Sequence, residues 1–190
     1  MRIVNGKLSV FLAAVLFAQI AHSQAAPQPS AAPKAADSPS KVLLDSWNDI
    51  GRKLIAMAED FPEDKYDFKP NPAQRSFAEQ LLHAAGANYF FINPVKGVKP
   101  PTGDVKRADF ATKAAVVAYV KKSFADGAEL IQSKGDGGLG DLYVDPFANQ
   151  QVRFSDLAWG LMEHSGEHYG QLVVYYRVAG LVPPESRPKK

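Results

Sequence analysis

Three histidines have residue types and spacing that could bind a divalent metal ion. His164 and His168 are four residues apart, so on an α-helix they lie on one face and direct their imidazoles to a common point. His83 lies on the apolar face of a second segment that would pack against the first. Three histidines with one vacant position are a known catalytic zinc arrangement, and imidazole also suits nickel, copper and iron. The alternative is that each imidazole is a hydrogen-bonded core residue.

Such a site would activate water. Three neutral imidazoles leave both charges of the ion uncompensated, and the pKa of a water at the open position of zinc falls to roughly 7. The first predicted function is therefore metal-dependent hydrolysis of a small substrate. Two alternatives stay open: S-transfer or isomerisation with a substrate thiolate at the open position, and a metal-binding module without turnover.

Glu79 is the first of three candidate catalytic residues. It lies one helical turn before His83, where it could accept a hydrogen bond from a ligand or carry a proton. It is also the fourth residue of Ser76-Phe77-Ala78-Glu79, which fits a helix capping box. In that case its carboxylate would accept a hydrogen bond from the Ser76 backbone instead.

Gln171 and Tyr175 are the other two candidates. They continue the face of the histidine pair by successive turns, so they could line a pocket and orient a substrate or a metal-bound water. The alternative is that they satisfy polar groups inside a helical bundle.

Four segments with apolar residues at helical spacing must position these side chains. The first opens at Ser38 or Ser40 and stops at Pro62. The second follows the capping box, carries His83 and runs to about Asn93, before Pro94. Both are amphipathic, so both should pack in one core.

The other two segments lie in the C-terminal half. We expect Asp109 to cap the third, which ends near Gly135, and Ser155 to cap the fourth, which carries the histidine pair and ends at Gly180. The apolar stripe expected on the third consists of Phe110, Ala114, Val117, Phe124, Ala128 and Ile131.

The pattern predicts an all-α protein, a four-helix bundle with long crossover loops. The links at 94–108 and 136–154 are long enough for crossovers, so simple up-down-up-down topology is not required. A short extended pair is expected at most around 142–154.

The first 23 residues predict an export signal. Arg2 and Lys7 precede an almost unbroken apolar run over 8–21, and Ala21-His22-Ser23 offers small residues for cleavage. The run of 14 residues is shorter than the roughly 20 that span a membrane, so an uncleaved anchor is the less favoured alternative. We expect a periplasmic or secreted protein without stable membrane insertion after cleavage.

The rest of the chain is one predicted domain behind a tether. Residues 24–40 are rich in Ala and Pro and predict a flexible linker, which leaves 41–185 for the bundle. The chain has no cysteine, so it has no disulfide and no thiol of its own. Two of its 22 Lys and Arg residues lie in the signal, and the other 20 balance 20 Asp and Glu. A neutral mature chain gives no reason to expect nucleic acid as a partner; a small molecule is the expected ligand.

Two motifs resemble the DinB-like (DinB/YfiT-like) metal-binding helical-bundle family. They are Ser-Phe-Ala-Glu-x-x-x-His, which ends at His83, and His-x-x-x-His-Tyr-Gly-Gln-Leu-x-x-Tyr-x-Arg, which begins at His164. With Phe-Pro-Glu-Asp-Lys-Tyr-x-Phe-Lys-Pro from Phe61, the resemblance covers about 41–181. It implies a four-helix bundle that holds zinc or nickel through His83, His164 and His168.

Characterised members of that family include thiol-dependent isomerases and S-transferases as well as suspected metal hydrolases. Association of two copies as a homodimer is left open by the sequence. The export signal is a departure from the family, because thiol chemistry of the cytosolic kind would need an exported small thiol.

The export prediction is tested by the mature N-terminus. Cleavage after Ser23 should give a protein that begins at Gln24, because the small residues at 21 and 23 are those that a signal peptidase selects. Intact-mass spectrometry of the periplasmic fraction measures this directly. Retention of residues 1–23 on most of the mature protein would instead support a membrane anchor.

Overall fold

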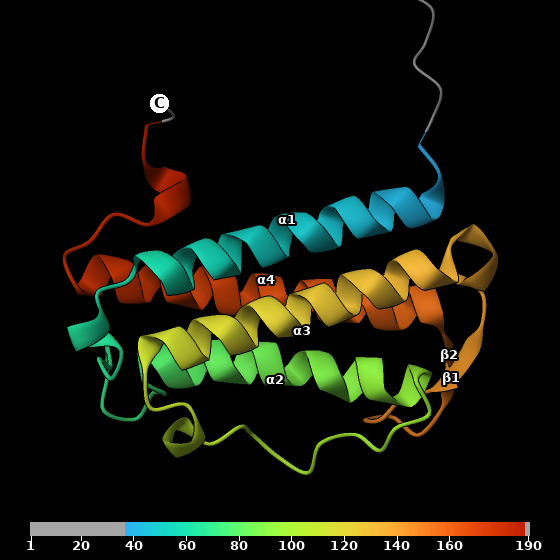
Figure 1. The fold of residues 1–190 in the computed structure, drawn as a ribbon, viewed down its shortest axis with the longest axis horizontal. Helices are drawn as coiled ribbons and strands as arrows, with labels where there is room; N and C mark the ends of the chain where they lie inside the picture. Colours follow the sequence, from blue (N-terminus) through green and yellow to red (C-terminus); the bar gives the residue numbers. More distant parts are fainter. Residues whose placement is uncertain (1–36, 189–190) are drawn as a thin grey trace, which may run out of the picture. The chain divides into compact units, whose positions relative to one another are not determined.

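Four long helices form the part of the chain that the computed structural model describes, residues 37–188. They are α1 (Pro39–Asp60), α2 (Phe77–Val95), α3 (Lys113–Lys134) and α4 (Phe154–Val178) (Figure 1). The predicted mostly helical four-helix bundle is therefore confirmed. The predicted signal and most of the predicted linker lie outside the described residues.

The remaining elements are short. One-turn 3-10 helices lie at Glu63–Lys65, Arg107–Asp109, Asp136–Gly138 and Pro184–Ser186. Strands β1 (Leu142–Val144) and β2 (Gln151–Arg153) form an antiparallel hairpin in which Tyr143 lies opposite Val152, as expected for this region. Within 37–188, no helix is both long and apolar enough to cross a membrane.

The helices are not arranged in sequence order around the bundle. α1 and α2 each pack against both α3 and α4, so α1 lies diagonally across from α2, and α3 lies diagonally across from α4. α1 and α4 run in one direction, and α2 and α3 run in the other (Figure 1). The link over 96–112 returns along the bundle, whereas the link over 135–153 stays at one end (Figure 1). α2 and α4, which carry the histidines, are therefore antiparallel neighbours.

An aromatic cluster fixes the start of α2. Phe61 and Phe77 stack with ring centroids 3.7 Å apart, and Tyr176 of α4 meets Phe61 edge-on at 4.9 Å. All three are fully buried. The Tyr176 hydroxyl donates to the Met57 carbonyl at 2.9 Å, so its polar atom is satisfied inside the core. These contacts hold α1, α2 and α4 together at the start of α2, before the helix reaches His83.

Two helix starts agree with the sequence prediction. Ser38 caps α1, with its hydroxyl accepting from the Lys41 backbone at 3.4 Å. The capping box of α2 is complete: the Glu79 N–H donates to the Ser76 hydroxyl at 3.3 Å, and the Ser76 N–H donates to the Glu79 carboxylate at 2.7 Å.

The other two starts correct the prediction. Thr112, not Asp109, caps α3 by accepting from the Ala115 N–H at 3.1 Å, while Asp109 belongs to the preceding 3-10 turn. α4 begins at Phe154, before Ser155.

The early start of α4 has a backbone cause. The N–H groups of Phe154 and Ser155 donate to the carbonyls of Asp141 and Leu139, at 2.8 and 3.1 Å. A serine cap is therefore not needed, because the adjoining loop already satisfies these donors. α2 also continues to Val95, two residues beyond the expected end. Pro94 is tolerated there because it lies in the last turn, where almost no helix follows it.

The buried face of α3 is also rotated from the predicted stripe. Ala114 is exposed and Val117 and Ala128 are half-buried, whereas small residues occupy the centre of the buried face. That face consists of Val116, Val120, Ser123, Phe124, Gly127, Leu130 and Ile131. The predicted stripe shares Phe124 and Ile131 with this face but omits the small residues Ser123 and Gly127.

Gly127 is small because Trp47 of α1 packs directly on it. A Cβ built at Gly127 would lie 2.3 Å from Cζ2 of Trp47, a fully buried side chain. The indole N–H of Trp47 donates to the Phe124 carbonyl at 2.8 Å, which fixes the ring in place.

Alanine substitutions at two helical glycines should therefore change stability in opposite directions. Gly127→Ala should lower the free energy of unfolding by about 1–2 kcal/mol, because overpacking against Trp47 exceeds the gain in helix propensity. Gly170→Ala in α4, where a Cβ meets nothing within 4 Å, should raise it by about 0.5–1 kcal/mol. Urea denaturation measures both. Equal stabilisation by the two changes would contradict the close Trp47–Gly127 contact.

Candidate metal centre

The three histidines meet between α2 and α4. The ring centroid of His83 lies 5.5 Å from that of His164 and 4.8 Å from that of His168, and the rings of the pair are 4.3 Å apart. Each residue offers one nitrogen, and these three atoms all lie within 4.8 Å of one another. The predicted convergence of the three side chains is confirmed.

The donor set fits a divalent ion. The Nε2 atoms of His164 and His168 are 3.0 Å apart, close to the roughly 3.4 Å between two nitrogens that share a tetrahedral zinc at about 2.1 Å. His83 is half-buried on the other helix, and its ligand nitrogen lies within 4.8 Å of the other two. Three nitrogen donors from two rigid helices therefore constitute a possible metal site.

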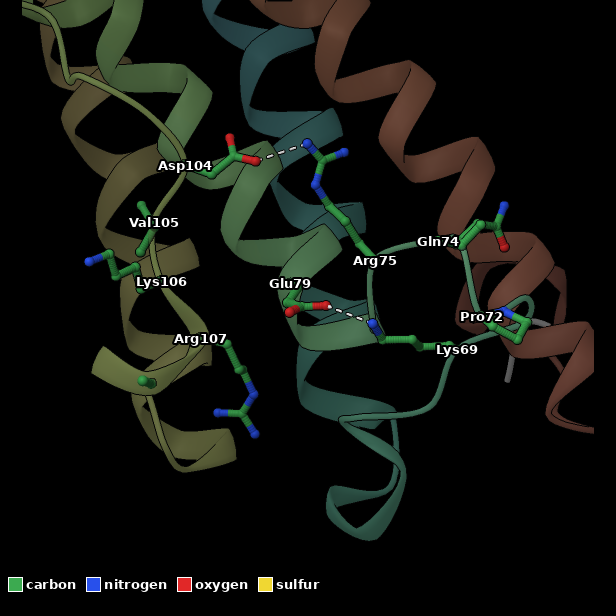
Figure 2. Close-up of a pocket in the computed structure, with 11 residues that line it drawn as sticks. Lys69, Pro72, Gln74, Arg75, Glu79, Asp104, Val105, Lys106 and Arg107 are labelled. Carbon is green, nitrogen blue, oxygen red and sulfur yellow. Dashed lines mark hydrogen bonds and ion pairs between the residues drawn. The ribbon is translucent and has the colours of Figure 1, made fainter.

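His83 is oriented by a carboxylate. Its Nδ1 lies 2.7 Å from Oδ1 of Asp104, in the link between α2 and α3. The other oxygen of Asp104 accepts from the Arg75 guanidinium at 2.9 Å (Figure 2). With Nδ1–H donated to Asp104, Nε2 of His83 keeps its lone pair for a metal. Partial burial opposes ionisation, but hydrogen bonds from His83 and Arg75 keep the pKa of Asp104 below its ordinary value.

His168 is held by two glutamines. Its Nδ1 lies 3.2 Å from the side-chain oxygen of Gln171, and the buried amide of Gln80 contacts both Nδ1 of His168 and Gln171. When the Gln171 carbonyl accepts Nδ1–H, Nε2 of His168, which faces His164, keeps its lone pair for a metal.

The pair on α4 is uncharged near neutral pH. Burial, together with the smaller effect of the neighbouring imidazoles of His168 and His83, lowers the pKa of His164 to about 4. Burial is also the main cause that lowers the pKa of His168. Neutral imidazole is the form that binds a metal.

The ring of His164 has no support comparable to that of the other two histidines. Its Nδ1 is buried and has no hydrogen-bond partner within 37–188. Its position therefore depends on the helix and on its Nε2 contact with His168.

Glu79 and Tyr175 lie away from the three nitrogens. The Glu79 carboxylate is engaged in the capping box and lies 3.8 Å from the Lys69 ammonium (Figure 2). The backbone hydrogen bond at Ser76 is the main cause that lowers the pKa of Glu79. The buried Tyr175 donates its hydroxyl to the Arg75 carbonyl at 2.6 Å. Both side chains hold the surroundings of the site, and their catalytic roles stay predictions.

A cavity of about 360 Å³ opens onto the histidines. Its lining includes His83 and His164 but is mostly apolar. The other lining residues are Gly86, Ala87, Phe90, Gly103, Asp104, Val105 and Phe147. A small molecule can therefore reach the site, and most of the wall that it meets carries no charge.

A second hollow lies on the opposite side of Asp104 and Val105. It is larger, about 600 Å³, and is lined by charged side chains that include Lys69, Arg75 and Arg107 (Figure 2). None of the three histidines lines it. Asp104 is the shared wall between this charged hollow and the metal site.

Sequence reasoning missed Gln80, Asp104 and Arg75. Gln80 precedes His83 by three residues, so a search of the two neighbouring helical positions before His83 would have found it beside Glu79. Asp104 and Arg75 lie in links, where no periodic pattern indicates a three-dimensional neighbour. Only the fold brings them to His83.

Comparison with known proteins agrees with this architecture. The model of the DinB superfamily matches residues 48–172. A DinB-like protein from Bacillus cereus is 21% identical with a TM-score of 0.63, and the alignment covers 76% of this chain and 95% of that one. A DinB-like protein from Bacillus subtilis is also 21% identical, with a TM-score of 0.58 and coverage of 78% and 99%.

YfiT from Bacillus subtilis has the same fold. It is 13% identical with a TM-score of 0.62, the alignment covers 80% of this chain and 94% of that one, and it is described as a probable metal-dependent hydrolase with an unusual four-helix bundle topology. A search of curated proteins finds no significant match.

The fold and the site define a four-helix bundle with a three-histidine cluster between two antiparallel helices. The match over more than half of its length shows that the chain belongs to the DinB superfamily.

Replacing Asp104 should weaken metal binding without unfolding the protein. Asp104→Asn removes the negative charge that orients His83, and loss of such a partner typically reduces metal affinity 10- to 100-fold. Competition with a chromogenic zinc chelator measures the affinity. Asp109→Asn, at an exposed carboxylate in the same link, is the matched control and should bind like wild type. An Asp104→Asn affinity within twofold of wild type would show that Asp104 does not orient the ligand.

Proposed function

We propose that this protein is an exported metal-dependent hydrolase that acts on a small substrate. His83, His164 and His168 hold one divalent ion, with zinc or nickel favoured by imidazole donors. The observation that carries the proposal is the convergence of three imidazoles, two of which, His83 and His164, line a cavity that a small molecule can enter. The description of YfiT, which has the same fold, as a probable metal-dependent hydrolase supports the same class of reaction.

The ion would supply Lewis acidity and acidify a water molecule at its open position. The chain supplies the rest of the site. Asp104 fixes the tautomer and orientation of His83, and the side-chain oxygen of Gln171 does the same for His168. The amide of Gln80 in turn donates to that oxygen. The uncharged imidazoles would leave the positive charge of the ion uncompensated, and this charge favours loss of a proton from water to give the hydroxide nucleophile. The apolar cavity wall restricts bulk water around the substrate.

The three candidate catalytic residues take positioning roles in this proposal. Gln171 acts through His168, Glu79 through the start of α2, and Tyr175 through the loop that carries Arg75. Gln171 contacts a ligand directly, whereas Tyr175 contacts the backbone of Arg75, the residue that pairs with Asp104. Location in the periplasm or outside the cell follows from the predicted signal and is part of the proposal.

Single histidine substitutions test the function. The protein starting at Gln24 should bind one zinc or nickel ion per chain, and His83→Ala, His164→Ala and His168→Ala should each lose most of it, because two ligands rarely hold a labile ion. Ester and amide hydrolysis should fall at least about 100-fold, while the free energy of unfolding changes less because the apolar core supplies most of it. Inductively coupled plasma mass spectrometry measures the metal content, chromogenic substrates measure hydrolysis, and urea denaturation measures the free energy of unfolding.

Glu163→Ala is the control for these variants. Glu163 is an exposed residue of α4 next to His164, so its removal should leave metal content and activity unchanged. Full metal occupancy in His83→Ala would contradict the proposed ligand set. A metal-loaded wild-type protein that cleaves no ester or amide would contradict the hydrolase assignment. It would favour a metal-binding module without turnover.

A further inference from the structure

Small residues on α2 create the space next to the histidines. Gly86 and Ala87 follow His83 by three and four residues, so they continue its face by one helical turn. Both line the cavity. A Cβ at Gly86 would lie 3.0 Å from Cγ2 of Val105, which shows how closely the link between α2 and α3 approaches the helix there. A larger side chain at Ala87 would occupy the cavity itself.

Two phenylalanines form the outer wall. Phe90 of α2 and Phe147 lie nearly parallel, with ring centroids 5.6 Å apart and an angle of 21° between the rings. Phe147 also contacts Phe91, at a centroid distance of 5.7 Å. The phenyl side chain of Phe147 is 68% exposed although it is large and apolar. It therefore presents ring surface that the protein itself does not cover.

The backbone holds Phe147 in this position. It lies in the turn between β1 and β2, where the N–H groups of Phe147 and Ala148 donate to the Asp145 carboxylate at 2.7 and 3.1 Å. Such an Asx-type turn fixes the local backbone. The aromatic wall is therefore formed before any ligand arrives.

Among residues 37–188, no lysine or arginine lines the cavity. Asp104 is the only charged residue of this described part that lines it, and its two oxygens already accept from His83 and Arg75. The basic side chains nearby belong to the separate hollow, where Arg75 pairs with Asp104 and Lys69 with Glu79 (Figure 2). Arg107, which also lines the hollow, pairs with Asp67. An anionic group is therefore not favoured next to the histidines, whereas an uncharged apolar group is.

We infer that the cavity binds a neutral aromatic ring, so that the substrate is an ester or amide with an aromatic group beside the bond that is cleaved. The inference rests on the proposed hydrolase function and names its substrate class. Hydrolysis of such a compound consumes one water, breaks the C–O or C–N bond of the acyl group, and releases a carboxylic acid with an alcohol or amine. A volume of about 360 Å³ is sufficient for the ring and its acyl group.

Hydroxamates of different size test the inference on the zinc-loaded protein. Benzohydroxamate and acetohydroxamate bind metal ions through the same group and differ in the phenyl ring. Calorimetry should show at least tenfold tighter binding of benzohydroxamate to wild type. Ala87→Leu should remove most of this preference by filling the cavity, and Phe147→Ala should reduce it by removing one wall. Ala118→Leu, at an exposed alanine of α3, should retain it. Zinc content is measured for every variant.

A metal-free experiment separates this inference from the proposed function. Fluorine NMR of 4-fluorobenzamide should show line broadening with the metal-free wild type and with Ala118→Leu, and little with Ala87→Leu. Probe binding that Ala87→Leu blocks supports the assignment of the cavity as an aromatic site. This result would hold even if the histidines bound no zinc, an outcome that would contradict only the proposed function. Equal affinity for the two hydroxamates, or probe binding that Ala87→Leu leaves unchanged, overturns the inference.

Discussion

The packing of α2 against α4 is the contact on which the site depends. His83 comes from one helix and the other two histidines from its antiparallel neighbour, so the three nitrogens approach only where these helices touch. The stacked pair Phe61 and Phe77, with Tyr176 against it, holds the relevant ends of the helices in register. Because these apolar contacts lie outside the histidine cluster, the bundle can form before a metal binds, and the buried neutral imidazoles are then already close together.

Helix positions and the histidine cluster were predictable because both follow from local periodicity. The spacing of His164 and His168 determines a common face in any α-helix, and the capping box at Ser76 marks the start of α2 without tertiary information. The start of α4 was wrong because its first N–H groups are satisfied by Asp141 and Leu139, from a loop whose path is not encoded locally. Gly127 was missed for a related reason: it is buried by the size of Trp47, not by its own apolarity.

The supporting residues of the site show the same limit. Gln171 was identified as a polar residue on the ligand face, but Gln80, which also contacts His168, comes from the other helix. Asp104 lies 21 residues after His83 in a link without periodicity, and it reaches the imidazole because that link returns along the bundle. A sequence pattern can therefore locate the donor atoms of a possible metal site more readily than the groups that fix their tautomers.

The link between α2 and α3 separates two chemically different surfaces. Asp104 gives one oxygen to His83 and the other to Arg75, so the histidine cluster and the charged hollow share a single carboxylate. Val105, the next residue, contributes an apolar wall to the cavity while its neighbours Lys106 and Arg107 line the hollow. The helices that carry the histidines are constrained by core packing, whereas this link is held by separate contacts along its length. Asp104 and Arg107 form ion pairs, and Phe110 packs against Tyr119. Changes in its other residues would alter the shape and charge of the cavity without moving the three nitrogens, so this segment is where one metal-binding bundle can acquire different substrates.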